Sequence, residues 1–246
     1  MAILDCFMFN DEFDILELRM KILYPHVDKF VIVQSKYTHS GKDRDIVNIN
    51  TRWPQYVDKI STYVVGKPQI YDKKNERWQL ENYHRNQISL GLNNLNNGDA
   101  VLISDVDEIP DLMNWNHSEG VFVQQHSYYK FDLIDPRPWN GTVCIAGWRF
   151  NSPYGKMTPQ DCRNFRDLLK PCGTGWHFGW IGSIEKAKKK IEDFAHFELD
   201  NSEMKEKKLI KCYEEGLHPS DGTPLNDKSD YFPKECKDYP QHWKFS

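Results

Sequence analysis

The stretch ILDCFMFNDEFDILELRMKILYPHVDKFVIVQ, residues 3–34, sets a strand, a helix and a second strand in immediate succession. Residues 3–9 are apolar and strand-like, and apolar side chains from Phe13 to Leu23 recur near the helical period until Pro25 ends the helix. Residues 29–34 are rich in β-branched side chains and form the second strand. This order is typical of a βαβ unit and predicts a parallel sheet in an α/β fold.

The remaining chain continues the alternation and then becomes more mixed. The patterns predict strands at 59–65 and 100–104, a β-rich segment at 120–133 and 142–150, and helices at 76–95, 183–194 and 202–216. Neither an internal repeat nor a linker divides the sequence. We therefore expect one domain over residues 1–246.

Composition narrows the classes of function. The hydrophobic fraction of 39% is enough for a sizeable core, and the net charge of −4 provides no basic field for nucleic acid. The apolar run from Ala2 to Phe9 is interrupted by Asp5 and has no basic leader. We therefore expect neither a signal peptide nor a membrane span, and a cytoplasmic or otherwise soluble location. Six scattered cysteines without a CxxC pair predict mostly reduced thiols.

A second stretch, VLISDVDEIP at residues 101–110, contains the candidate ligand-binding acids. Asp105, Asp107 and Glu108 follow a buried strand, where open α/β sheets collect their ligands. Two aspartates at this spacing suit a hard cation, Mn²⁺ or Mg²⁺, and leave positions open for a diphosphate. Without a cation, the crowded carboxylates would have raised pKa values. In the alternative interpretation, Asp107 and Glu108 cap a helix at Pro110 and Asp105 is a solvated turn residue.

A glycine-rich stretch, GTGWHFGWIGS at residues 173–183, precedes a predicted helix. Its glycines permit close backbone approach to a ligand, Trp176 can stack on a sugar or base, and His177 can complete a metal shell or merely pack. Arg85 and the lysines of residues 186–190 suit phosphate, although a lysine run alone is more typical of a solvated helix face.

Five blocks in this order resemble family-17 glycosyltransferases, the family that includes the enzyme adding the bisecting N-acetylglucosamine of N-glycans. They are FNDEFDILELRMKILYPHVDKFVIVQSKYTHSGKDRDI (9–46), ENYHRNQI (81–88), SDVDEIP (104–110), GWHFGW (175–180) and KIEDFAHFE (190–198). The resemblance implies a GT-A-like single domain with a mostly parallel, Rossmann-like central sheet flanked by helices. Residues of about 1–110 would bind a nucleotide sugar, and about 111–246 would face a glycan acceptor.

The resemblance also implies an inverting transfer and roles for particular residues. Asp107, Asp105 and His177 are the expected metal ligands, and the expected donor-binding residues are Asp105, Arg85, Gln34 and Trp176. Many members have glutamate at the end of the second strand, where this chain has Gln34, so Gln34 cannot supply the carboxylate of those members. The candidate bases are Glu198, Asp193 and Glu108, with His196 as a helper or ligand. For the acceptor we consider Tyr128, Tyr129, Trp139 and Trp148, of which at most two are expected to contribute.

The donor sugar is open, with UDP-N-acetylglucosamine favoured over UDP-glucose, UDP-xylose and GDP-sugars. One alternative function is a sugar-binding module whose site has decayed, which the glutamine at Gln34 motivates. Another is a D-x-D phosphatase, which usually has Thr or Val where this chain has Glu108.

Overall fold

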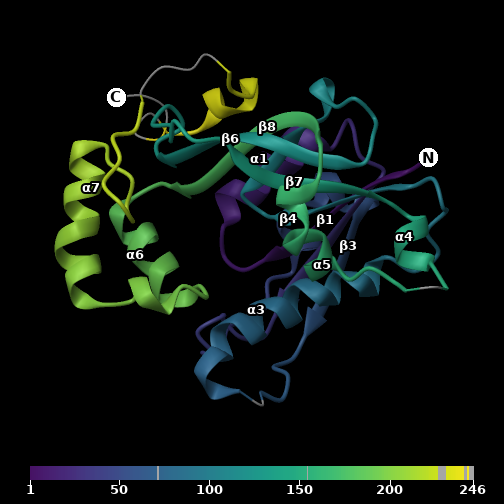
Figure 1. Cartoon of the computed structure of the whole chain (residues 1–246), viewed down its shortest axis with the longest axis horizontal. Helices are drawn as coiled ribbons and strands as arrows, with labels where there is room; N and C mark the ends of the chain where they lie inside the picture. Colours follow the sequence, from purple (N-terminus) through teal and green to yellow (C-terminus); the bar gives the residue numbers. More distant parts are fainter. Residues whose placement is uncertain (71, 154, 227–230, 241–242, 244–246) are drawn as a thin grey trace.

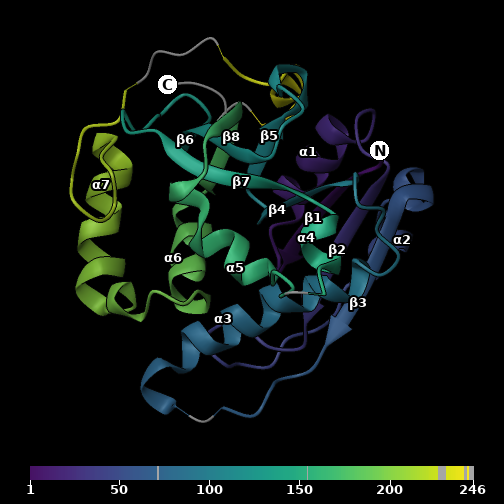
Figure 2. The same cartoon turned by 45° about the vertical axis from the view of Figure 1, so that its right-hand side comes forward.

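The computed structural model describes residues 1–70, 72–153, 155–226, 231–240 and 243, and contains one eight-stranded sheet. The strand order is β3-β2-β1-β4-β7-β6-β8-β5, and Figures 1 and 2 show the sheet twisting through the middle of the molecule. The strands are β1 (Ile3–Phe9), β2 (Lys29–Ser35), β3 (Ile60–Val65), β4 (Ala100–Asp105), β5 (Glu108–Asp111), β6 (Gly120–Tyr129), β7 (Trp139–Ala146) and β8 (Pro171–Ile181).

The sheet is mixed, so the prediction of a mostly parallel sheet is wrong. Strands β3, β2, β1 and β4 are parallel, as the βαβ order predicts. Strand β7 then runs antiparallel to both β4 and β6, and β5 runs antiparallel to β8, whereas β6 and β8 are parallel. The direction changes because β6 and β7 are joined by a short connection without a crossover helix, which permits antiparallel pairing.

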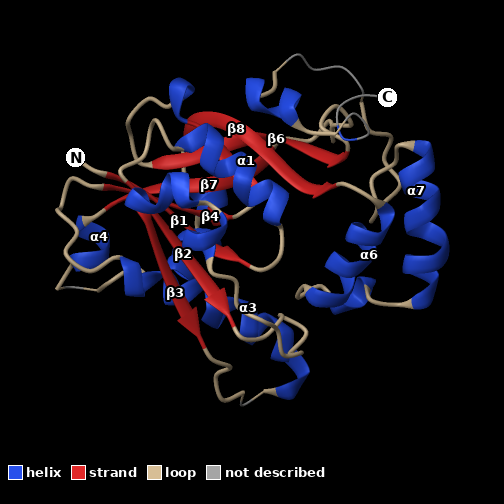
Figure 3. Ribbon diagram, turned by 180° about the vertical axis from the view of Figure 1, so that it is seen from behind, coloured by secondary structure: helices blue, strands red, loops and turns tan. Residues whose placement is uncertain are grey.

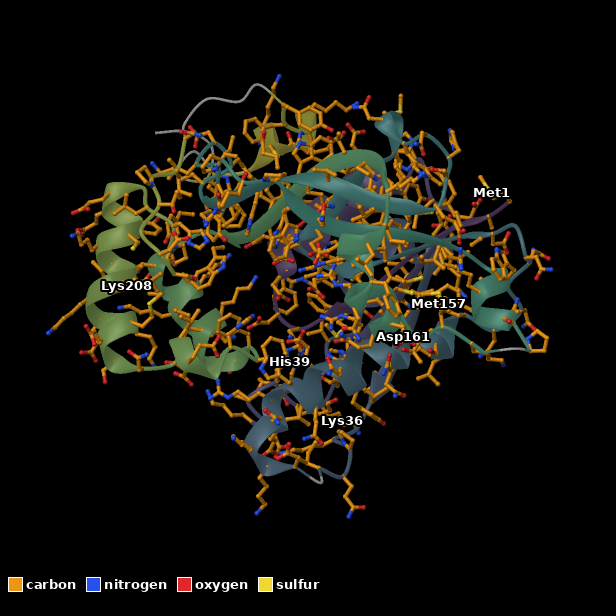
Figure 4. The ribbon with its side chains drawn as sticks, viewed as in Figure 1. Met1, Lys36, His39, Met157, Asp161 and Lys208 are labelled. Carbon is orange, nitrogen blue, oxygen red and sulfur yellow. The ribbon has the colours of Figure 1, made fainter. Side chains whose placement is uncertain are left out.

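Helices cover both faces of the sheet. They are α1 (Phe13–Leu23), α2 (Ile49–Arg52), α3 (Glu76–Asn86), α4 (Trp148–Asn151), α5 (Pro159–Asn164), α6 (Ile184–Asp193) and α7 (Leu209–Glu215). Alternate residues of β2 separate the two layers: Phe30 and Ile32 pack in the cluster that contains α1, and Val31 and Val33 pack in the cluster on the side of α5. Asp161, labelled in Figure 4, marks α5, which contacts α3, β4 and β7.

Helices α6 and α7 form a smaller unit at one end of the sheet (Figure 3). Ala187 and Ile191 of α6 are buried with Leu209 and Cys212 of α7 in a cluster of their own, which reaches the sheet through the end of β6. A π-helical segment, Met204–Lys208, leads into α7. The predicted helices at 183–194 and 202–216 are therefore confirmed.

One other local prediction, a helix over 76–95, differs from the structure. The helix expected over 76–95 ends at Asn86 and continues as a 3-10 segment, Gln87–Gly91. The glycine-rich stretch, for which no secondary structure was predicted, forms most of strand β8. Its glycines serve close packing, because a Cβ at Gly175 would lie 2.4 Å from the carbonyl oxygen of Ile109 in β5.

The cysteines form no disulfide bonds in the part of the chain that the structure describes, in agreement with the prediction of mostly reduced thiols. All six cysteines are free and buried. Within the described ranges, no helix combines the length and the apolar character needed to cross a bilayer.

Candidate active site

Residues 105–108, called here the acidic turn, connect β4 to β5 at the carboxyl end of the central strand. Glu108 starts a strand and Pro110 lies within it, so the alternative in which these acids cap a helix is excluded. Strand β5 lies at the edge of the sheet, where a proline costs no ladder hydrogen bond.

Arg19 of α1 donates hydrogen bonds to the backbone of the acidic turn. One guanidinium nitrogen, Nη1, donates to the carbonyl oxygens of Asp105 (2.9 Å), Val106 (3.1 Å) and Glu108 (2.9 Å). The rest of the guanidinium pairs with Asp5 of β1, with Nε–Oδ2 at 2.7 Å, and both side chains are fully buried. The turn is thereby fixed to α1 and β1 by a charged group that has no access to water.

Asp105 is paired with two arginines. Arg85 Nη2 lies 2.9 Å from Oδ1, and Arg163 Nη2 lies 3.2 Å from Oδ2. Burial alone would raise the pKa of Asp105, but Arg85 and Arg163 together bring it well below its usual range. The side chain nevertheless keeps about a third of its surface exposed, 33%, so its oxygens remain within reach of a ligand.

Glu108 is almost completely buried and both of its oxygens are occupied. Arg163 donates to Oε2 at 2.6 Å and to Oε1 at 2.8 Å, and the indole of Trp139 donates to Oε1 at 2.7 Å. Such a carboxylate can position its neighbours, here the ring of Trp139.

Asp107 faces a lysine and a histidine. Its Oδ2 lies 2.7 Å from Lys190 Nζ, and its Oδ1 lies 3.6 Å from His177 Nε2. Burial would raise the pKa of Asp107, but Lys190 and His177 hold it well below its usual value. The expectation of raised pKa values without a metal ion is therefore wrong for Asp105 and Asp107, because arginine and lysine side chains lie against these two carboxylates.

His177 is stacked on one ring and contacts a second. In β8 it lies beside His126 of β6, with ring centroids 3.8 Å apart, and the Trp139 ring lies 4.9 Å away. Within the described residues, His177 Nδ1 and His126 Nε2 are buried without a hydrogen-bond partner. Burial lowers the pKa of His126 well below its usual range, and the neighbouring His177 lowers it further, so its imidazole is neutral at pH 7.

The separation of Asp107 and His177 fits one divalent cation. Two ligand atoms about 2.1 Å from the same ion lie about 3.0 Å apart at a right angle and about 3.6 Å apart at 120°. The Oδ1–Nε2 distance of 3.6 Å corresponds to the wider of these two angles. Among the described residues, no group of three or more His, Cys, Asp and Glu side chains is suited to a metal, and Asp105 is held by arginines instead.

Two of the predicted donor-binding residues have other partners. Trp176, whose side chain points to the opposite face of β8 from His177, is buried in the core and donates to the carbonyl of Tyr231 at 2.9 Å. The amide of Gln34 exchanges two hydrogen bonds with the backbone of Val47, at 2.9 and 3.1 Å, and so fixes the loop after β2.

The segment that follows α6 carries the other predicted acids. Asp193 ends α6, its backbone carbonyl accepts from Ser40, and its carboxylate lies 3.4 Å from Lys42. Glu198 is half exposed and pairs with His196 at 2.7 Å. The loop after β2, which contains Ser40, also contains His39, labelled in Figure 4. His39 contacts His84 of α3 at 3.3 Å, so this loop packs against both α3 and the end of α6.

Of the four aromatic residues considered for the acceptor, one borders the acidic turn. Trp139 is bound to Glu108. The rings of Tyr128 and Tyr129 are buried against the α6–α7 unit, and Trp148 is exposed in α4 beside Arg149.

Several residues of this site were not identified from the sequence. Arg19, Arg163 and His126 lie far from the acidic turn in the chain, and no local pattern marks them. Glu12 had a usable signal, because it follows β1, whose carboxyl end adjoins that of β4. Burial raises the pKa of Glu12, and Asp11 and Asp107 oppose the lowering effect of Lys190.

Residues 1–213 match the sequence profile of glycosyltransferase family 17, and this range includes every residue of the site described above. The chain belongs to glycosyltransferase family 17. Its members are transferases, so the prediction of a glycosyltransferase is confirmed at that level, and a sugar donor and an acceptor are its expected partners. A search of curated proteins returned no match.

Proposed function

We propose that this family-17 member catalyses an inverting, cation-dependent transfer of a sugar from a nucleotide donor to a hydroxyl of a glycan. UDP-N-acetylglucosamine is the favoured donor, Mn²⁺ or Mg²⁺ the cation, and a β linkage the product. The observation that carries the proposal is the Asp107–His177 pair at the carboxyl end of β4. A GT-A-like arrangement, with the donor in residues of about 1–110 and the acceptor facing about 111–246, is part of the same proposal.

The protein groups would each have a defined task. A cation held by Asp107 and His177 would offset the negative charge of the departing diphosphate. Asp105, kept ionised by its arginines and partly exposed, is suited to the donor ribose or a bridging water. Glu108 fixes Trp139 beside His177, where the indole ring is suited to pack on a sugar face.

An inverting transfer needs one carboxylate that takes the proton of the acceptor hydroxyl. Glu108 is the least suited candidate, because both of its oxygens are occupied. Burial would raise the pKa of Glu198, but backbone hydrogen bonding and His196 bring it below its usual value, which weakens it as a base. We therefore add Glu12, which follows β1 beside the carboxyl end of β4 and whose pKa is raised by burial, to Asp193 and Glu198.

Single replacements would identify the base. Glu12→Gln, Asp193→Asn or Glu198→Gln should lower kcat by a factor of about 10² or more at the true base. The same variant should bind UDP with normal affinity in Mn²⁺, because the base contacts the acceptor. If all three variants retain kcat, none of these carboxylates is the base.

The transfer itself is tested by product release. The wild-type protein is incubated with Mn²⁺ and a panel of UDP- and GDP-sugars, and free nucleoside diphosphate is measured with and without glycan acceptors. Asp107→Asn should abolish release, whereas the matched control Asp14→Asn, an exposed acid paired with Lys186, should not. No release by the wild type, together with glycan binding that survives Asp107→Asn, would instead support a sugar-binding module.

A further inference from the structure

Helix α6 carries three lysines that contact acids on the body of the protein, and one of them differs from the others. Lys186 pairs with Asp14 and Lys189 with Asp11, and about half of the surface of each of these four side chains is exposed. Lys190 points inward instead, to Asp107 at 2.7 Å and to the carbonyl oxygen of Gly179. The prediction of a solvated lysine face thus holds for Lys186 and Lys189 but not for Lys190.

The packing of α6 explains why Lys190 reaches the site. Ser183 caps the helix, and Gly182 before it has a φ of +123°, which sets the angle at which α6 leaves β8. Ala187 and Ile191 are buried in the α6–α7 cluster, so the orientation of the helix is fixed by its own core. Lys190, next to Ile191, consequently extends toward the acidic turn.

Lys190 occupies the place of a cation on Asp107. The Asp107 side chain is only 7% exposed, and a buried carboxylate without a counter-ion is costly. A divalent ion bound to the same carboxylate would repel the ammonium group at this short range. The lysine side chain has four methylene groups and can move its charge by several ångströms without any movement of the helix.

We propose that Lys190 is the resting counter-ion of Asp107 and transfers to the donor diphosphate when a divalent cation binds the carboxylate. This inference rests on the proposed function. Lysine binds phosphate as a point charge, so one side chain can serve both partners in turn. In this scheme Lys190 keeps the empty site neutral and later contributes to donor affinity.

The exchange predicts two opposite effects of removing the charge. In Lys190→Met, Mn²⁺ alone should bind about tenfold more tightly, because its competitor is gone. UDP at saturating Mn²⁺ should bind about tenfold more weakly, because a charge-assisted contact to the diphosphate is lost. A residue that only stabilises the fold would not shift the two affinities in opposite directions.

Isothermal titration calorimetry on the full chain measures both affinities, first with Mn²⁺ alone and then with UDP. The matched control is Lys189→Met, on the same helix and paired with an exposed acid, which should change neither value. Lys190→Gln, which keeps a donor for the Gly179 carbonyl, should behave as Lys190→Met does and guards against a folding defect in the latter.

Asp107→Asn distinguishes a failure of the lysine exchange from a failure of the proposed cation site. If Mn²⁺ binding in the wild type is lost in Asp107→Asn but unchanged in both Lys190 variants, the exchange is refuted and the proposed function stands. If neither the wild type nor the Lys190 variants bind Mn²⁺ through Asp107, the cation site and the exchange are both refuted. Opposite shifts confined to the Lys190 variants support the exchange.

Discussion

Replacement of Arg19 by methionine should separate the stability of the fold from the geometry of the acidic turn. Arg19→Met leaves Asp5 as a buried charge without a partner and removes the donor of three carbonyl oxygens in the turn. Breaking a buried ion pair from one side costs about 3–5 kcal/mol. This is a large part of the total stability of a domain, about 5–15 kcal/mol.

The magnitude can be measured by urea denaturation of the wild type and three variants. Arg19→Met should lose about 4 kcal/mol or more of the free energy of unfolding, and Asp5→Leu/Arg19→Met should recover most of that loss, because no buried charge remains unpaired. Lys21→Met, on the same helix in a half-buried pair with Glu17, should change stability by less than about 0.5 kcal/mol.

The double variant carries the test of the positioning role. It lacks the three hydrogen bonds to the turn, so its affinity for UDP in Mn²⁺ should stay low even though its stability returns. Recovery of both properties would show that Arg19 does not position the turn. A loss of less than about 1 kcal/mol in Arg19→Met would refute the assignment of a buried, uncompensated charge.

Three further predictions concern packing, pH and thiol reactivity. Gly175→Ala should weaken the β5–β8 pairing and lower the melting temperature because of the 2.4 Å approach, whereas Gly98→Ala, with open space around it, should not; equal melting temperatures would contradict the packing. The folded-state pKa of Asp107 lies below the unfolded value of about 3.9, so its stabilisation is complete above about pH 4 and is lost as the pH falls through the folded pKa. Urea titrations at pH 6 and pH 3 should therefore show a larger loss of stability between the two pH values in the wild type than in Asp107→Asn. A smaller loss in the wild type would contradict a lowered folded-state pKa of Asp107. Burial raises the pKa of Cys162 and of Cys172 to about 12, so Ellman's reagent at pH 8 should react with them after unfolding and not before.

The N-terminal half of the fold was predictable because its signals are local. Apolar periodicity and Pro25 give the strand, helix and strand of β1, α1 and β2, and the order of these elements gives their parallel pairing. The β-rich segment after residue 120 was predictable as strands but not as a topology. In particular, β8 lies between β6 and β5, and its glycines permit the close packing of these strands. Glycines are equally common in loops, so the sequence did not indicate this placement.

By itself the sequence determined that acids follow a buried central strand and that the five family blocks occur in order. Only the tertiary structure decided which lysine or arginine pairs with which acidic residue. Lys190 is 83 positions from Asp107, and Arg163 is 58 positions from Asp105. Such pairs depend on strand order and on the direction in which a helix leaves the sheet, and these are set by long-range packing that no local pattern of residues encodes.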